Sequence, residues 1–275
     1  MWRQRPRTIA VIVFFMGICV FGGVNGAPVD LPLSCFVVHC ESTRANEGMF
    51  LDLSDLVAFA DTFGIPLTID CTAQWAEMIL ADARKLDAAS AWLVAGREIA
   101  GHHHAYWATL DRGAQWDGYT NTSFSELLPI LQDRYLGMMD EYMALLEALP
   151  GERTTACMGL GDGRDLIDWP EALLYGTAGH LLVDCVSEPT LVDHAGFQTW
   201  QITDGLILQE PSVLPAFYEA TNGDKVFAVV GHAYNFAEDR RPFESWVRFL
   251  RERDSDGVRR RTVTKLIEER LNDGS

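Results

Sequence analysis

Five of the seven histidines in this 275-residue chain follow short apolar runs, where a strand is expected to end. His39 closes the first run, the triplet 102–104 closes the third, and His232 closes the last strong one. Glu41 adds a carboxylate two residues after His39. Because parallel α/β folds place ligand sites at the carboxyl ends of their strands, we expect these side chains to meet at one edge of a sheet.

The spacing within each run sorts these side chains by direction. Side chains of an extended segment alternate, so His102 and His104 point the same way while His103 faces elsewhere, and His39 and Glu41 share a side. Imidazole and carboxylate together suit a zinc-like ion with an open coordination position, which polarises a carbonyl and activates water. The alternative interpretation is that the triplet is a solvent-facing loop tip and His39 a hydrogen-bonded core residue.

Short apolar runs alternate with amphipathic stretches along the chain, and these elements must position the histidines. Strands are predicted at residues 35–40, 66–71, 98–102, 154–158, 181–186, 206–209 and 225–231. Helices are predicted at residues 52–63, 125–149, 166–175, 243–250 and 262–271, with another beginning at Thr72. Strands that are apolar on both faces and alternate with helices predict a mainly parallel sheet covered by helices. No linker or repeat divides residues 28–275, so we expect one α/β domain, whose strand number favours a barrel.

The charge balance limits the partners of the protein. The chain has 39 acidic and 22 basic residues, a formal net charge of −17, and 48% of its residues are hydrophobic, which excludes a disordered chain. A phosphate backbone or an anionic lipid surface is bound mainly through Lys and Arg. The composition therefore argues against nucleic acid and anionic membrane as partners.

Residues 1–26 differ from the rest of the chain. Three arginines precede an uncharged, mostly apolar run over residues 9–24, and small residues follow at the expected cleavage offsets. This pattern predicts a secretory signal peptide and export to the periplasm or the extracellular space. A retained membrane anchor is the alternative, but the run is shorter than the ~20 residues that span a bilayer, so we expect no stable membrane span after cleavage.

Other polar clusters give weaker indications. Residues 115–121 mix aromatic and hydrogen-bonding side chains, as either a sugar-binding rim or a self-packed loop would. His180 and His194 fall outside the strand-end cluster and are expected to be structural. Asp165 is expected to cap a helix.

Four segments resemble the polysaccharide deacetylases with a NodB-homology domain, carbohydrate esterase family 4. Residues 96–102, GREIAGH, look like the GHEIGNH stretch that this family places before its metal-binding histidine. Residues 59–68 look like its helix-to-strand passage, and residues 229–232 with 262–266 are similar to its closing strand and last helix. The resemblance spans roughly residues 34–271.

The resemblance implies an incomplete (β/α)7 barrel that binds a divalent metal, usually zinc, and hydrolyses an N-acetyl or O-acetyl group on a glycan. By position, His102 matches the first metal-binding histidine, and Glu41 stands where a metal-binding aspartate falls. His232 matches the general-acid histidine. The net charge favours a neutral or amine-bearing glycan over an acidic polymer.

The chain departs from the family pattern at three places. Cys40 stands at the position of the catalytic base, Tyr106 at that of the second metal-binding histidine, and no arginine lies near Cys157, where the third motif would place one. A thiol is a poor base at neutral pH. We expect His104 to replace the missing ligand and His39 the missing base.

The sequence thus predicts an exported, metal-dependent carbohydrate deacetylase. Glu41, His102 and His104 would bind the metal, His39 would act as base or further ligand, and His232 would protonate the leaving group. One alternative is a protein that keeps the fold but only binds glycans or serves a structural role. A third is a glycosidase on a related barrel, which requires paired carboxylates, for which Glu41 and Asp70 are the candidates.

Overall fold

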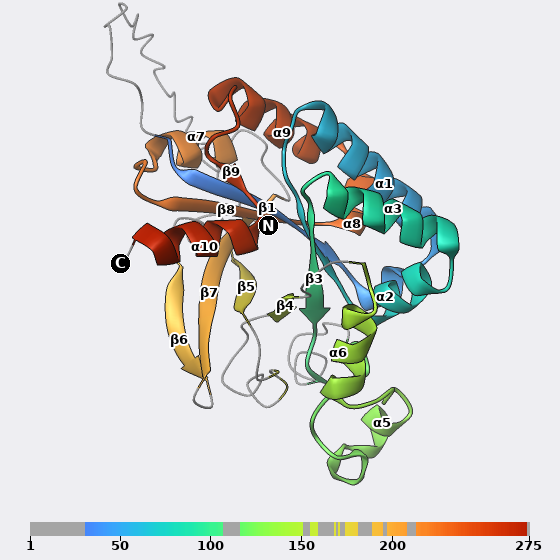
Figure 1. The fold of residues 1–275 in the computed structure, drawn as a ribbon. Helices are drawn as coiled ribbons and strands as arrows, with labels where there is room; N and C mark the ends of the chain where they lie inside the picture. The colour runs from blue at the N-terminus through green and yellow to red at the C-terminus, as the bar shows by residue number, and fades with distance from the viewer. Residues whose placement is uncertain are drawn as a thin grey trace, which may run out of the picture.

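The computed structural model describes residues 31–106, 116–150, 155–158, 168, 170, 174–180, 189–194, 197–207 and 213–273. A curled sheet of mainly parallel strands is ringed by helices (Figure 1). Hydrogen bonds join seven of the strands in the order β4-β3-β2-β1-β8-β7-β5. This arrangement confirms the predicted incomplete (β/α) barrel.

The strands of the main path are parallel to one another. Their bounds are β1 Leu33–Cys40, β2 Thr68–Cys71, β3 Glu98–His103, β4 Thr155–Met158, β5 Tyr175–His180, β7 Phe197–Leu206 and β8 Val226–His232. β6 (Thr190–His194) pairs antiparallel with β7, and β9 (Arg260–Arg261) pairs with the start of β1. β1 is therefore central, with β2 on one side and β8 on the other.

Helices connect and cover the strands. Their bounds are α1 Glu47–Thr62, α2 Ala73–Leu80, α3 Ala83–Val94, α5 Pro129–Gln132, α6 Met139–Glu147, α7 Val213–Ala220, α8 Ala233–Glu238, α9 Arg241–Arg253 and α10 Val263–Asp273, with short 3-10 turns η1 Ser42–Arg44 and η2 Phe124–Glu126. Among the described residues, no helix is long and apolar enough to cross a membrane. The predicted signal peptide lies outside the described residues.

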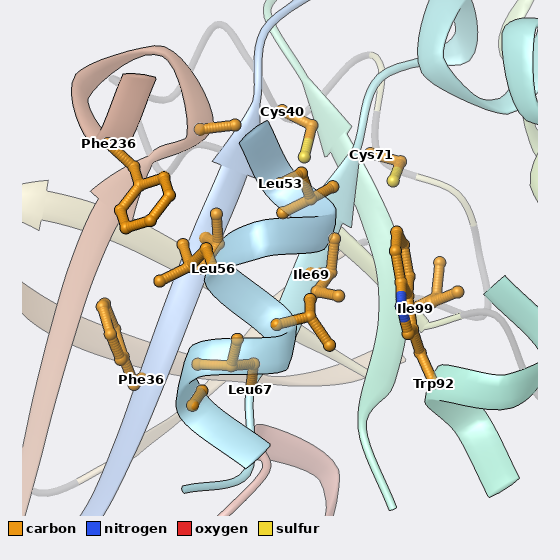
Figure 2. Close-up of a cluster of buried hydrophobic side chains, with 14 of the residues drawn as sticks. Phe36, Cys40, Leu53, Leu56, Leu67, Ile69, Cys71, Trp92, Ile99 and Phe236 are labelled. Carbon is orange, nitrogen blue, oxygen red and sulfur yellow. The ribbon is translucent and has the colours of Figure 1, made fainter. Parts of the chain in front are cut away.

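The two faces of β1 belong to two different apolar clusters. Phe36, Val38 and Cys40 face the helices α1, α2 and α9 in the larger cluster, part of which Figure 2 shows. Cys35 and Val37 face the inside of the curled sheet. A strand buried on both faces reads as a continuous apolar run, which explains the sequence of β1.

Helix α10 closes the end of the barrel at which the strands begin. Its first turn is tied to the starts of two strands, because the Val263 N–H donates to Thr68 Oγ1 at 3.0 Å and the Thr264 N–H to Glu98 Oε2 at 2.9 Å. Val263, Leu266 and Ile267 pack into the inner cluster. The opposite end, where the strands finish, is the end that carries the histidines.

The predicted helix over 125–149 is wrong, because the structure divides this segment into η2, α5 and α6. Between α5 and α6 the chain pairs with the loop before η2: the Leu136 N–H donates to the carbonyl of Gly118 at 2.7 Å, and the Thr120 N–H to that of Gly137 at 3.2 Å. This tertiary pairing overrides the amphipathic pattern. A Cβ at Gly137 would lie 2.0 Å from a carboxylate oxygen of Glu141, so the glycine allows the close approach.

Other boundaries also differ from those predicted. The helix expected from Thr72 divides into α2 and α3, where Asp82 accepts a hydrogen bond from the N–H of Arg84 and caps α3. α1 begins earlier than expected, at Glu47, with Asn46 as its cap. Tyr175, placed at the end of a helix, starts β5. Of the strand predicted at 206–209, Leu206 is the last residue of β7, Ile207 lies beyond that strand, and 208–209 lie outside the described residues. The strand predicted at 181–186 lies outside the described residues.

Candidate metal and acid-base site

The strand ends bring His39, His102 and His232 together. In the ladder around β1, His39 is paired with His232 on β8. The His39 ring stacks on that of His102, with centroids 4.0 Å apart, and meets the His232 ring edge-on at 5.4 Å. The predicted convergence of the first, third and last strand ends is therefore present in the structure.

Glu41 lies at the centre of this group. Its Oε1 is 3.5 Å from Nε2 of His102 and 3.4 Å from Nε2 of His232. Its Oε2 is 3.1 Å from Nε2 of His104. Ligand atoms of Glu41, His102 and His104 all lie within 4.8 Å of one another, so these residues form a group that can hold a metal ion.

The donor set fits a divalent cation of the zinc type, for which imidazole and carboxylate are usual ligands. His102 is only 2% exposed, yet neither of its ring nitrogens has a hydrogen-bond partner among the described residues. Buried polar groups in native proteins are nearly always hydrogen-bonded, so such an exception calls for an explanation. A cation between Glu41 and His102 would supply the missing partner.

The charges of the group also favour a cation. Burial raises the pKa of the Glu41 carboxyl, but its contacts with His102 and His104 outweigh burial and hold this pKa well below its ordinary value. Burial and the neighbouring imidazoles lower the pKa of His39 and of His102. At neutral pH the site therefore offers a carboxylate and the unprotonated imidazoles of His39 and His102. Burial also lowers the pKa of His104, but its contact with Glu41 outweighs burial and raises this pKa.

His232 is oriented by the first turn of α8. Its Nδ1 lies 3.1 Å from Oδ1 of Asn235, an acceptor that holds the ring proton on Nδ1. Nε2 then presents a lone pair to Glu41, so two acceptors face each other unless a proton or a cation lies between them. Burial lowers the pKa of His232 to about 4. The Tyr234 ring lies 5.1 Å from that of His232, with the guanidinium of Arg44 on Tyr234 at 5.5 Å.

Asp70 places a second carboxylate next to His39. It is the partner of His39 in the ladder between β1 and β2, and it is fully buried. Its Oδ2 lies 3.6 Å from Nε2 of His39.

Cys40 is a core residue. Because side chains alternate along β1, its thiol points away from His39 into the helix-facing cluster, beside Cys71 and Leu53 (Figure 2). Burial raises the pKa of the Cys40 thiol well above its ordinary value. The residue that occupies the family's base position therefore lies outside the site.

Tyr106 is a core residue as well. It packs with Trp116, Leu127 and Leu131, and the centroids of the Tyr106 and Trp116 rings are 5.9 Å apart. Trp116 and Tyr119 are buried, and the indole N–H of Trp116 donates to the carbonyl of Tyr119 at 2.7 Å. The sugar-binding rim is thus wrong for the described part of this loop, which is self-packed.

His103 faces away from Glu41, as predicted, but it lies in a buried polar cluster that sequence reasoning missed. Its Nδ1 is 2.8 Å from Oδ2 of Asp117, and its Nε2 is 3.4 Å from Oδ2 of Asp168. Burial lowers the pKa of His103, but the two carboxylates outweigh it and raise this pKa to about 10. The cluster excludes the solvent-facing loop tip as an interpretation of the triplet, since His102 and His103 are buried.

Helix α2 supports both halves of the site. The indole N–H of Trp75 donates to the carbonyl of Glu41 at 2.9 Å, and the side-chain amide of Gln74 donates to the carbonyl of Asp117 at 2.5 Å. Neither residue was predicted to serve the site. His180 and His194 lie on β5 and β6, and their side chains are outside the described part of the structure.

Comparison with known proteins adds a fold-level relationship. No protein family model matches the sequence, and no curated protein matches it. A crystal structure from Mycobacterium smegmatis, assigned as a polysaccharide deacetylase, matches with a TM-score of 0.55 and 13% identity, over 91% of this chain and 96% of that one. This chain has a polysaccharide deacetylase-like fold.

Other solved structures match less completely. The 4-alpha-glucanotransferase of Thermococcus litoralis matches with a TM-score of 0.55 and 10% identity, over 87% of this chain and 40% of that one. A CE4 family pseudoenzyme from Bacillus anthracis matches with a TM-score of 0.40 and 10% identity, over 88% of this chain and 66% of that one. At these identities the likeness concerns the fold alone.

Proposed function

We propose that this protein is an exported, metal-dependent hydrolase that removes acetyl groups from a carbohydrate. The observation that carries the proposal is the convergence of Glu41, His102 and His104 within 4.8 Å at the edge where the strands end. The polysaccharide deacetylase-like fold supports the carbohydrate substrate. Export rests on the composition of residues 1–26.

Glu41, His102 and His104 would hold the ion, which we propose to be zinc. Catalytic zinc sites combine three protein ligands with one open position, and two imidazoles with one carboxylate are such a set. When bound, the ion supplies a Lewis acid that polarises the substrate carbonyl and makes water more acidic.

His39 would take the proton of the attacking water. Its ring is unprotonated at neutral pH, stacks directly on that of His102, and has Asp70 behind it at 3.6 Å. A neighbouring carboxylate fixes the orientation of an imidazole that acts as a base. His39 on β1 and Asp70 on β2 would thus together replace the single aspartate that is the base in the family pattern.

His232 would give a proton to the leaving amine or alkoxide. Asn235 fixes Nδ1, so Nε2 is the atom directed at the centre of the site, 3.4 Å from Oε1 of Glu41. Because burial lowers the pKa of His232 to about 4, its Nε2 is unprotonated at neutral pH, so it would first take up a proton from solvent and then pass that proton to the leaving group. Glu41 would stabilise that protonated form.

The carboxylates at the site bear on the glycosidase alternative, and acetate release bears on the binding-only alternative. A glycosidase needs two carboxylates facing the sugar. Among the described residues at this edge, Asp70, Asp117 and Asp168 are buried, whereas the side chain of Glu41 is 16% exposed. A binding-only protein would bind glycans without releasing acetate.

The test is acetate release from acetylated chito-oligosaccharides by purified protein, with zinc and with chelator. We expect release that requires zinc and that disappears in His102→Ala. Glycan binding without acetate would favour the binding-only protein. Purified protein that takes up neither zinc, nickel nor cobalt would contradict the metal-dependent mechanism.

A further inference from the structure

The buried cluster of His103, Asp117 and Asp168 lies directly behind the proposed metal ligands, and the proposed function does not use it. The two ring nitrogens of His103 face one carboxylate each, at 2.8 Å and 3.4 Å. His103 is 3% exposed, Asp117 1% and Asp168 0%. A buried polar cluster restricts the geometry of the chain around it, because each of its side chains needs its hydrogen-bond partners.

Asp117 holds two consecutive residues of the triplet. Its Oδ2 accepts from the backbone N–H of His104 at 3.3 Å as well as facing Nδ1 of His103. Its Oδ1 accepts from the backbone N–H of Tyr119 at 3.1 Å. Both carboxylate oxygens of Asp117 therefore face N–H donors.

In the described part of the structure, Asp168 contacts the histidine triplet through one ring atom, Nε2 of His103. Its Oδ1 accepts from the hydroxyl of Thr120 and the backbone N–H of Asn121, both at 2.7 Å. Its Oδ2 faces Nε2 of His103 at the longer distance of 3.4 Å.

Among the described residues, no ladder pair includes His104. The ladder between β2 and β3 ends at Gly101, and the ladder between β3 and β4 ends at His103. His104 lies one residue beyond the sheet, and the hydrogen bond from its N–H to Asp117 takes the place of a ladder bond. The Nε2 of this residue reaches Oε2 of Glu41 at 3.1 Å.

We propose that Asp117 is a positioning residue for the metal site: by holding His103 and the backbone of His104, it directs His102 and His104 together toward Glu41. The inference rests on the proposed function, because it concerns the same metal ligands. Residues that orient metal ligands contribute about 10- to 100-fold to metal affinity.

Two isosteric substitutions test this inference. Asp117→Asn leaves a single oxygen where two oxygens accept hydrogen bonds, so its NH₂ must face an N–H in either orientation. Asp168→Asn keeps an oxygen for Thr120 and Asn121 and leaves the contacts of Asp117 with His103 and His104 in place. Asp168→Asn is therefore the matched control.

The measurement is the Kd of the purified full chain for Zn(II) and for Co(II), with the visible spectrum of bound Co(II) as a report of ligand geometry. We expect Asp117→Asn to weaken binding about 10- to 100-fold and to change the Co(II) spectrum. Asp168→Asn should stay within about threefold of wild type. Thermal unfolding of each variant shows that it is folded at the temperature of the titration.

Each outcome shows whether Asp117 positions the metal ligands or only stabilises the fold. Wild-type affinity in Asp117→Asn, or an equal loss in Asp168→Asn, overturns the positioning role while leaving the proposed function intact. A wild-type chain that binds neither ion overturns both. If Asp117→Asn does not fold, Gln74→Leu removes the amide that holds the Asp117 carbonyl; a severalfold weaker Kd supports the role, and an unchanged Kd contradicts it.

Discussion

His39 on β1 and Asp70 on β2 are ladder partners, and Nε2 of the histidine lies 3.6 Å from Oδ2 of the carboxylate. A fully buried carboxyl group next to an imidazole orients the ring. Asp70→Asn keeps the shape but replaces the carboxyl group with an amide. We expect kcat for acetate release to fall about 100-fold, while Kd for zinc stays near the wild-type value.

Two further variants serve as comparisons for Asp70→Asn. His39→Ala should lower kcat at least as much as Asp70→Asn, because it removes the proposed base itself. Asp87→Asn, an isosteric change at an exposed position on α3, should leave kcat unchanged. A Kd for zinc that weakens in parallel with kcat would instead assign Asp70 to metal binding.

Zinc should stabilise the folded protein, because an ion that binds only the native state lowers its free energy. At a zinc concentration 100-fold above Kd, the gain is about 2.7 kcal/mol, or roughly 5–10 °C in Tm for a chain of this size. Glu41→Gln removes the central carboxylate, so its Tm should not respond to zinc. The exposed Glu268→Gln serves as control and should respond like wild type; an equal response in Glu41→Gln would place the ion elsewhere.

Cys40→Asp restores the family's carboxylate in sequence but not in space. Position 40 is 0% exposed and faces the helix-side core, where an unpaired carboxylate costs several kcal/mol. We expect urea unfolding to show a loss of this size, against about 1 kcal/mol for Cys40→Ala. Higher acetate release from a stable Cys40→Asp protein would contradict the direction assigned to this side chain.

Tyr106→His restores the family's second histidine in the same formal way. The tyrosine packs against Trp116 in its own small cluster, so the new imidazole should not reach the metal site. We expect an unchanged Kd for zinc and a lower Tm, whereas His104→Ala should abolish zinc binding. A tighter Kd in Tyr106→His would show that position 106 faces Glu41 after all.

The sequence predicts the parts of the site that depend on local periodicity. Strands buried on both faces stand out as apolar runs, and alternation correctly separates His102 and His104 from His103. The convergence of His39 and His232 follows from a general property of parallel sheets. These inferences need no knowledge of distant contacts.

The parts that were missed depend on contacts between distant segments. The pairing of Gly118 with Leu136 breaks an otherwise regular amphipathic pattern, and no local feature announces it. Asp117 and Asp168 carry no local sequence signal that connects them with the site until His103 is placed between them. Cys40 and Tyr106 seemed to be losses from a catalytic pattern, yet their side chains belong to packing clusters.

Two consecutive side chains of α2, Gln74 and Trp75, hold the carbonyls of Asp117 and Glu41, which are far apart in sequence. The two backbone segments that flank the site are thus hydrogen-bonded to one helical turn. A displacement of α2 would therefore act on the Glu41 segment and on the Asp117 segment at the same time. The two halves of a centre whose geometry must be held within a few tenths of an ångström share one support.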